Sequence, residues 1–270
     1  MRFLLRTLAA ALLLLPAYAL FAYVVMPVSW LGYHRFAGGS GAPACVTRTL
    51  EGIAADPLNV ALVGSREDIA AALEKAGWSP ADRITLRSGL RDATSVLFHR
   101  PYVSAPVSTH VLRGRPQDLA FEQIVGGSPR RRHHVRLWRA NDPKDPHATV
   151  WLGAATYDRG LGFSRYTGEV VHRIETRVDT ERDKLVADLV RERPGAGVDC
   201  TLRVREAGRG VNGGGDVYET DGRLCTTFVG APASVPEPFE IEAALKGALP
   251  SAPPAQSPSS GAFPRISVKS

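Results

Sequence analysis

The sequence is poor in cysteine and lacks the short motifs that identify common metal and nucleophile sites. Its 270 residues contain three cysteines, Cys45, Cys200 and Cys225, without a C-x-x-C spacing. This excludes a zinc ribbon and a thioredoxin-type redox motif. The sequence also contains neither H-E-x-x-H nor G-x-S-x-G, so no helical zinc-protease site or hydrolase nucleophile elbow is encoded. We find no internal repeat. The sequence by itself therefore names no reaction.

A strong charge of either sign is also missing. The chain carries 33 Lys and Arg against 27 Asp and Glu, a net charge of +6. A mild positive excess suits anionic lipid headgroups as well as nucleic acid. No RNP, zinc-finger or helix-turn-helix signature accompanies it, so we expect no nucleic-acid partner. Hydrophobic residues make up 44% of the chain, enough for one domain with a buried core.

The N-terminal stretch is apolar enough to cross a bilayer. No side chain between Arg6 and Arg35 is charged, and Leu8–Leu31 is almost wholly apolar. As a helix at 1.5 Å per residue this run covers roughly 36 Å, against a bilayer core of about 30 Å. Ala17-Tyr18-Ala19 resembles a signal-peptidase site, but a cleaved signal needs no apolar residues beyond it. The sequence therefore predicts an uncleaved transmembrane anchor over residues 1–35.

Flanking charges give the expected orientation of this anchor. Arg2 and Arg6 precede the apolar run. Arg35 and Arg48 follow it, so the amino terminus only tips the balance of positive charge. With the amino terminus in the cytoplasm, the rest of the chain lies outside, on the periplasmic side in a bacterium with two membranes. We expect a single-pass membrane protein of the bacterial cell envelope.

Composition divides the remaining chain into three parts. Residues 36–56 begin with a Gly-, Ser- and Pro-rich stretch typical of a short tether that leaves the membrane. A folded domain is expected over residues 57–249. Residues 250–270 are rich in Pro, Ser and Ala, which is typical of a disordered tail.

Periodicity predicts the helices of the folded domain. Asn59–Gly64 is a short apolar strand, and Ser65 with Asp68 three residues on starts a helix that ends at Gly77. Further helices are expected over Leu86–Phe98, from an N-cap at Thr180 to Val190, and over Pro238–Leu249.

Short extended segments dominate after Pro101. Thr149–Tyr157 is apolar on both faces and is expected to be the central strand. The other strands expected are Ser108–Arg113, Ala120–Val125, His133–Arg139, Gly168–Glu175 and Val198–Arg205. We therefore predict an α+β fold with a mixed, largely antiparallel sheet flanked by helices.

The C-terminal part of the domain contains two expected turns and two cysteines. Glu206–Asp216 is Gly-rich and is expected to be a flexible loop tip, and Asp221-Gly222 is typical of a hairpin turn. Cys200 and Cys225 lie on neighbouring predicted strands. They either form a disulfide, if the domain lies outside the cytoplasm, or are two small buried residues. The predicted hairpin favours the second alternative, because it sets Cys225 opposite Tyr218.

Two histidines and an aspartate are the candidate catalytic residues. By strand alternation, His133 shares a face with Val135 and Leu137, and His172 lies on the apolar face of its own strand. Asp158 lies at the end of the central strand. If these three side chains meet, they are sufficient to hold a divalent metal or to run acid–base chemistry. The alternative is that each histidine is buried and bonded to a backbone carbonyl.

A glycine- and arginine-rich run before His133 is the candidate anion site. Gly126-Gly127-Ser128 is followed by Arg130, Arg131 and Arg132. Glycine-rich backbone and guanidinium groups together can cradle a phosphate, and near a membrane the obvious anion is a phospholipid headgroup. The alternative is a solvated turn whose charges keep the protein soluble.

Across these residues the chain resembles the LssY C-terminal domain family. The matching pieces cover about residues 56–193 in order: DPLNVALVG (Asp56–Gly64), AGW (Ala76–Trp78), RPQDLAF (Arg115–Phe121), RHHVRLW (Arg132–Trp138), WLGAATYD (Trp151–Asp158) and DTERD (Asp179–Asp183). The family often carries a His-His pair where this chain has His172-Arg173, so only His172 carries over.

The resemblance implies work at a bilayer, because similar domains occur attached to DedA-like and lipid-phosphatase-like membrane proteins. It implies no particular chemistry, cofactor or protein partner. Two functions therefore stay open. The first is a binding module of the membrane surface that holds an anionic phospholipid headgroup or a membrane partner through Arg130–Arg132. The second is a hydrolase of phosphate-bearing envelope lipids that uses His133, His172 and Asp158, with or without a metal.

Overall fold

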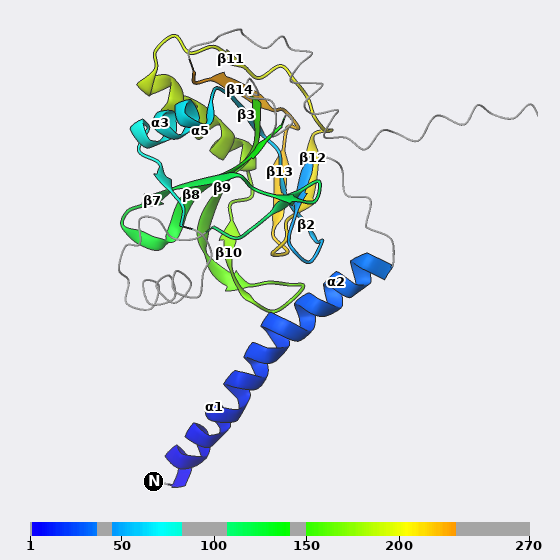
Figure 1. The fold of residues 1–270 in the computed structure, drawn as a ribbon. Coiled ribbons are helices and arrows are strands. Elements are labelled where there is room, and N and C mark those ends of the chain that lie inside the picture. The colour runs from blue at the N-terminus through cyan, green and yellow to red at the C-terminus, as the bar shows by residue number, and fades with distance from the viewer. Residues whose placement is uncertain (1, 37–44, 83–106, 141–149, 231–270) are drawn as a thin grey trace, which may run out of the picture.

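The computed structural model describes residues 2–36, 45–82, 107–140 and 150–230 (Figure 1). The chain begins with a long helix made of α1 (Arg2–Leu20), a π-helical turn η1 (Phe21–Val25) and α2 (Met26–Phe36). This helix projects away from the rest of the molecule (Figure 1). Its segment Ala10–Phe36 is long and apolar enough to cross a membrane, as the sequence predicts.

A mixed sheet forms the centre of the domain. Its strand order is β11-β14-β3-β9-β8-β7-β4, with β10 paired to the far half of β9. Only β14 and β3 pair in parallel, and the other pairs are antiparallel. The predicted fold class is confirmed. The strands are β3 (Val60–Val63), β4 (Ser79–Pro80), β7 (Leu119–Val125), β8 (Ser128–Arg139), β9 (Val150–Phe163), β10 (Val170–Ile174), β11 (Val198–Asp199) and β14 (Cys225–Phe228).

Helices cover one face of this sheet and smaller sheets cover the other. The helices are α3 (Arg66–Lys75) and α5 (Val178–Glu192). On the opposite side lie a four-stranded sheet and a two-stranded hairpin (Figure 1). Their strands are β1 (Val46–Arg48), β2 (Ala54–Pro57), β5 (Val111–Leu112) and β6 (Arg115–Pro116), followed by β12 (Gly208–Val211) and β13 (Val217–Thr220).

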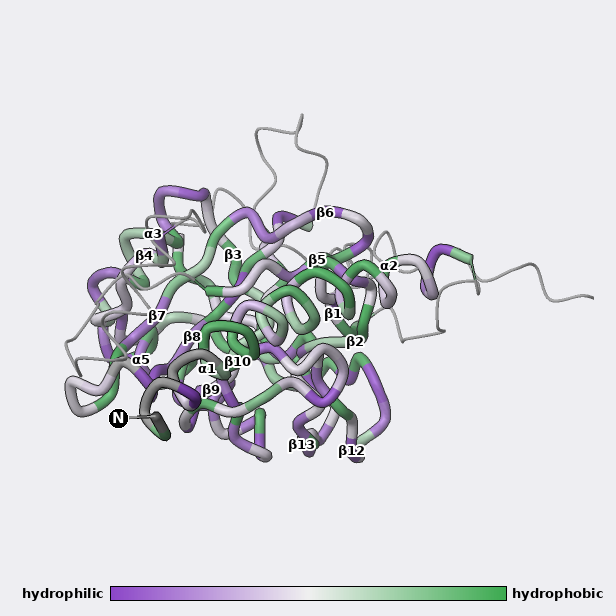
Figure 2. Tube along the Cα trace, turned by 90° about the horizontal axis from the view of Figure 1, so that it is seen from below, coloured by the Kyte–Doolittle hydropathy of each residue, from purple (hydrophilic) through white to green (hydrophobic). Residues whose placement is uncertain are grey.

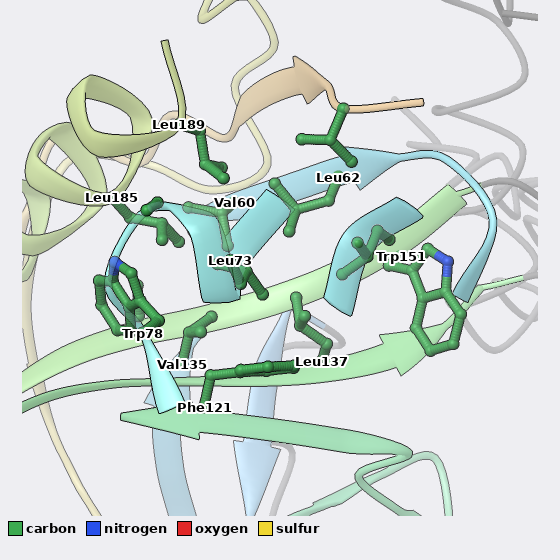
Figure 3. Packing of buried hydrophobic residues seen from close by; sticks show 14 residues of the cluster. Val60, Leu62, Leu73, Trp78, Phe121, Val135, Leu137, Trp151, Leu185 and Leu189 are labelled. Atoms are coloured by element: carbon green, nitrogen blue, oxygen red, sulfur yellow. The ribbon is translucent and has the colours of Figure 1, made fainter. Parts of the chain in front are cut away.

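The main hydrophobic core lies between the central sheet and the two helices (Figure 3). Leu73 of α3 and Leu185 of α5 are both fully buried against it, and each such leucine contributes about 1.5–3 kcal/mol. Close packing explains Gly153 in the middle of β9, since a Cβ there would lie 2.6 Å from a methyl carbon of Val60. The buried residues of this core are Val60, Leu62, Ile69, Leu73, Ala76, Trp78, Phe121, Val135, Leu137, Trp151, Ala155, Leu185, Leu189 and Val229.

Of the two predicted helix starts, one is confirmed and the other is not. Ser65 and Asp68 form the predicted capping box at α3, each side chain bonding the other's backbone N–H. The predicted N-cap at Thr180 is wrong, because α5 already begins at Val178. The carboxylate of Asp179 accepts hydrogen bonds from the Thr220 hydroxyl and the Asp221 N–H. These bonds hold the first turn of α5 in place before Thr180, where the capping pattern predicts the helix to start.

The predicted hairpin at Asp221-Gly222 is also wrong. β13 pairs with β12, so part of the expected Glu206–Asp216 loop is a strand. The Asn212 side chain accepts hydrogen bonds from the N–H groups of Gly214 and Asp216 and closes the actual turn.

The disulfide is formed, contrary to what the predicted hairpin favours. β11 pairs with β14 so that Asp199 faces Thr226. The same register places Cys200 opposite Cys225, and their sulfurs are 1.98 Å apart.

Several predicted boundaries change. The tether predicted over residues 36–56 contains β1 and most of β2, and Cys45 is buried. The strands expected at Ser108–Arg113 and Val198–Arg205 shrink to β5 and β11. The expected helices Leu86–Phe98 and Pro238–Leu249, and the tail at residues 250–270, lie outside the described residues.

Candidate functional site

Alternate residues of β8 carry charge into the interior. Arg132, His134 and Arg136 share the face turned away from α3 and α5, and each is about 3% exposed. The register with β9 places Arg132 opposite Asp158 and His134 opposite Thr156. Because both faces of the sheet are covered, this face is a buried polar surface and not a solvated one.

Arg132 is held between two carboxylates. Its Nη1 donates to Glu122 at 2.8 Å and its Nε donates to Asp158 at 3.0 Å. Glu122 is fully buried and Asp158 is 2% exposed. A buried guanidinium that bridges two buried carboxylates satisfies charges which would otherwise be very costly to bury.

Hydrogen bonding fixes the tautomer of His134. Its Nε2 lies 2.8 Å from Nη1 of Arg136. A guanidinium only donates, so Nε2 must accept and carries no proton. The ring proton is then on Nδ1, which lies 3.3 Å from Asp158 Oδ2, and the Thr156 hydroxyl donates to Nε2 at 2.7 Å.

The charged chain continues to a second sheet. Arg136 Nη1 donates to Asp56 of β2 at 2.9 Å, and His110 Nδ1 lies 3.4 Å from the same carboxylate. Burial lowers the pKa of His110 well below its usual value, and the charge of Arg136 acts in the same direction. His110 is therefore neutral at physiological pH. Burial raises the pKa of Asp56, and Arg136 opposes that effect.

The pKa of Asp158 is shifted in the opposite direction to that of Asp56. Burial alone would raise the pKa of Asp158, but the hydrogen bond from His134 and the charge of Arg132 lower it below its usual value. Asp158 is therefore a fixed carboxylate at physiological pH, with the imidazole of His134 3.3 Å away.

These groups line a cavity of about 730 Å³. Its wall combines the buried charged residues with β10, the β12–β13 turn and the N-terminal helix. The lining residues include Tyr23, Glu51, Asp56, His110, Arg132, His134, Arg136, Asp158, Glu169, Val171 and His172.

The N-terminal helix reaches this cavity because β9 and β10 extend from the sheet and dock on it (Figure 1). Tyr18 donates its hydroxyl to the Gly168 carbonyl at 2.6 Å, and the Val170 N–H donates to the Tyr23 hydroxyl at 3.0 Å. Seen from below, the largely hydrophobic helix lies in front of the ends of these strands (Figure 2). The cavity therefore lies next to the segment that is able to cross a membrane.

Comparison with known families decides where the chain belongs. Residues 40–224 match the family described as LssY C-terminus. The chain belongs to the LssY C-terminus family. No curated protein and no solved structure matches it. The resemblance that the sequence motifs indicate is thereby confirmed, and together with the apolar helix it fits a membrane-anchored protein.

The LssY C-terminus fold does not bring the three candidate catalytic residues together. Asp158 and His172 line the cavity. His133 lies on the other face of the sheet, where its Nδ1 bonds to Glu181 of α5 at 2.7 Å. Alternation correctly places His133 with Val135, but the expected approach of His133 to His172 is wrong.

The structure also separates the three arginines of the candidate anion site. Arg132 is buried in its two ion pairs, whereas Arg130 and Arg131 are exposed. The pairing of β8 with β9 ends at Arg132 and Asp158, so Arg130 and Arg131 lie beyond the paired part of β8 and β9. An anion site built from all three side chains is therefore not formed, and only the exposed pair is able to meet an external phosphate.

No metal site is evident in the part of the chain that the structure describes. No three His, Cys, Asp or Glu side chains there are grouped so as to hold an ion. His134 and Asp158 are close, but the imidazole nitrogen that faces the carboxylate carries the ring proton, and the other nitrogen accepts from Arg136.

Sequence reasoning missed His134, Arg136, Asp56 and His110. One signal was available, because Arg132, His134 and Arg136 recur at a spacing of two within a strand whose other face is apolar. Nothing local marks Asp56 or His110 as their partners, since these come from separate strands and segments.

Proposed function

We propose that this protein is a membrane-anchored binding module of the cell envelope that takes the polar headgroup of a bilayer lipid into the cavity. The observation that carries the proposal is the composition of the cavity wall. Buried charged residues such as Asp158 and Arg136 and a residue of the N-terminal helix, Tyr23, line the same space. A lipid lying against the helix thus lies next to the cavity.

The size of the cavity supports this proposal. Ligand sites in proteins are commonly about 300–1,000 Å³, and this cavity has about 730 Å³. A headgroup fits such a volume, and the acyl chains remain in the bilayer beside the helix.

The charge of the wall favours a headgroup with a positive group. The two guanidinium groups are already bonded to carboxylates, so they do not form an empty anion cradle. Four lining carboxylates against two guanidinium groups give a difference of −2 when the histidines are neutral: Glu51, Asp56, Asp158 and Glu169 against Arg132 and Arg136. We therefore propose a zwitterionic, amine-bearing headgroup for the cavity, and leave anionic phospholipids to the exposed Arg130 and Arg131.

The disulfide supports the periplasmic side for the domain. Disulfides persist in oxidising compartments and are rare in the cytosol, and Cys200 is bonded to Cys225. This agrees with the orientation that the flanking arginines favour.

Lipid retention tests the proposal. The full chain is placed in nanodiscs of equal phosphatidylethanolamine and phosphatidylglycerol, and bound lipid is identified by native mass spectrometry after release. Val171→Trp places bulk in the cavity, and Val198→Trp makes the same change at an exposed site on β11. We expect wild type and Val198→Trp to retain phosphatidylethanolamine and Val171→Trp to lose it. Equal retention by all three proteins, each with native circular dichroism, would sink the proposal.

A second candidate is a hydrolase of a phosphate-bearing envelope lipid. It is favoured by Asp158 and His172, since a carboxylate and an imidazole that line one cavity suit general acid–base chemistry. His133 takes no direct part in this version. Phosphate release from vesicle lipids by the full chain, with and without added divalent metal, is the assay. Release that His172→Gln abolishes while lipid retention persists would establish the enzyme.

A further inference from the structure

The ends of β9 and β10 form a two-stranded arm outside the main sheet. β8 and β9 stop pairing at Arg132 and Asp158, and beyond this point β9 pairs with β10 out to Phe163 and Val170. The segment between Asp158 and Ile174 therefore extends beyond the end of β8, and the tip of this arm rests on the N-terminal helix (Figure 1).

The arm is docked on the helix through its main chain. Besides the bonds of Tyr18 to Gly168 and of Tyr23 to Val170, the Trp30 indole N–H donates to the Tyr166 carbonyl at 2.9 Å. Ala22, between the two tyrosines, is fully buried. Three aromatic side chains spaced along the helix thus bond to main-chain groups of one short segment, residues 166–170.

The position of the tyrosines sets the depth of the arm. A bilayer core needs about 20 helical residues, and the charge-free stretch is bounded by Arg6 and Arg35. Every window of that length between the two arginines contains both Tyr18 and Tyr23. If the helix spans the bilayer in the observed arrangement, the main chain bonded to these hydroxyls lies at the depth of the hydrocarbon core.

The hydrogen bonding of the tip suits this depth. Irregular backbone is tolerated there only if its polar groups are satisfied within the protein. The Ser164 N–H donates to the Glu169 carbonyl at 2.8 Å, and the Gly168 N–H donates to the Ser164 carbonyl at 3.0 Å. Ser164 Oγ accepts bonds from the N–H groups of Tyr166 and Thr167.

Two of the exposed residues of the tip are apolar. Phe163 is 63% exposed and Val170 is 48% exposed, and they face each other in the register. The Phe163 ring also meets the Tyr18 ring edge-on, so this exposed surface continues the apolar surface of the helix. Arg165 is exposed, and its long side chain allows its charge to reach the headgroup layer.

We propose that the tip of the arm, residues 163–170, is inserted into the bilayer as a second membrane contact, docked on the N-terminal helix. The partner is the lipid bilayer itself. This contact fixes the domain relative to the membrane independently of whether the cavity holds a headgroup.

Depth measurements on the full chain test this inference. A nitroxide is attached at Phe163→Cys or, as a control, at Val198→Cys, which is 42% exposed on β11. Both are made with Cys45→Ala, and the chain is placed in vesicles of phosphatidylcholine and phosphatidylglycerol at three to one. Relaxation by oxygen reports hydrocarbon, and relaxation by a water-soluble nickel complex reports water. We expect at least a fivefold higher oxygen-to-nickel ratio at position 163 than at position 198.

Equal ratios at the two positions would overturn the proposal. A second variant tests the docking itself, because Tyr18→Phe with Tyr23→Phe removes two hydroxyls but keeps the helix apolar. We expect the ratio at position 163 to fall toward that at position 198. A ratio that stays high in this variant leaves the insertion standing and removes the tyrosine bonds as its cause.

Discussion

Arg132 offers the sharpest test of the buried charge network. Replacing it by methionine keeps a long side chain in place and removes the guanidinium. Glu122 and Asp158 then lose their shared partner in the interior, and the low pKa of Asp158 loses part of its cause.

The expected cost follows from the burial of both carboxylates. Breaking one buried ion pair costs about 3–5 kcal/mol, because an uncompensated charge remains. Arg132 bonds to two carboxylates, of which Glu122 is fully buried and Asp158 is 2% exposed. We therefore expect the free energy of unfolding of Arg132→Met to fall by about 4–5 kcal/mol, at the upper end of that range.

Urea unfolding of the full chain in detergent, followed by tryptophan fluorescence, measures this loss. Arg131→Met is the matched control, since Arg131 is exposed and one residue away. We expect it to change the unfolding free energy by no more than about 0.5 kcal/mol. Adding Glu122→Gln and Asp158→Asn to Arg132→Met should recover most of the lost unfolding free energy. A difference below about 1 kcal/mol between the two arginine variants would refute the reasoning about the network.

Three further predictions concern pH, packing and lipid charge. The pKa of His110 is depressed in the folded state, so below the reference value of 6.5 only the unfolded chain binds its proton. Stability should fall with pH below 6.5 by up to about 1.4 kcal/mol per unit, and His110→Gln should remove that component from the pH dependence of urea unfolding. A Cβ at Gly153 would meet two side chains at 2.6 and 2.8 Å, whereas nothing lies within 4 Å of one at Gly160. Thermal unfolding should therefore show Gly153→Ala destabilised by about 1–3 kcal/mol and Gly160→Ala by much less. Replacing Arg130 and Arg131 by serine should weaken the binding of the domain to anionic lipid, measured by crosslinking, by about 1 kcal/mol per arginine at low salt. Binding to zwitterionic lipid should not change. An unchanged preference for anionic over zwitterionic lipid would show that the two arginines are not lipid contacts.

Local patterns were sufficient for much of the fold. The capping residues Ser65 and Asp68 place α3 where the sequence predicts it. The two-faced apolar run at Thr149–Tyr157 identifies β9 as the central strand, and the structure extends it to Phe163. The Asp221-Gly222 pair shows the limit of such patterns. Gly222 does adopt a positive φ of 78°, but the strands on either side pair elsewhere.

The site could be predicted only in part, because its contacts join distant parts of the chain. Alternation gives the face of His133 and therefore, by exclusion, the face of His134. It does not show that a second sheet covers that face, nor that Asp56 provides the carboxylate for Arg136. The position of the cavity beside Tyr23 depends on the arm reaching the N-terminal helix. No local sequence pattern contains that information.

The most direct test of the central claim is where a lipid headgroup attaches to the protein. The full chain in phosphatidylethanolamine bilayers that contain a photoreactive diazirine on the headgroup is irradiated, and the modified peptides are mapped by mass spectrometry. The account predicts adducts on cavity residues, above all around His172 and Ser108–His110, and their loss in Val171→Trp. Adducts confined to the N-terminal helix and the exposed arginines, unchanged in Val171→Trp, would contradict it.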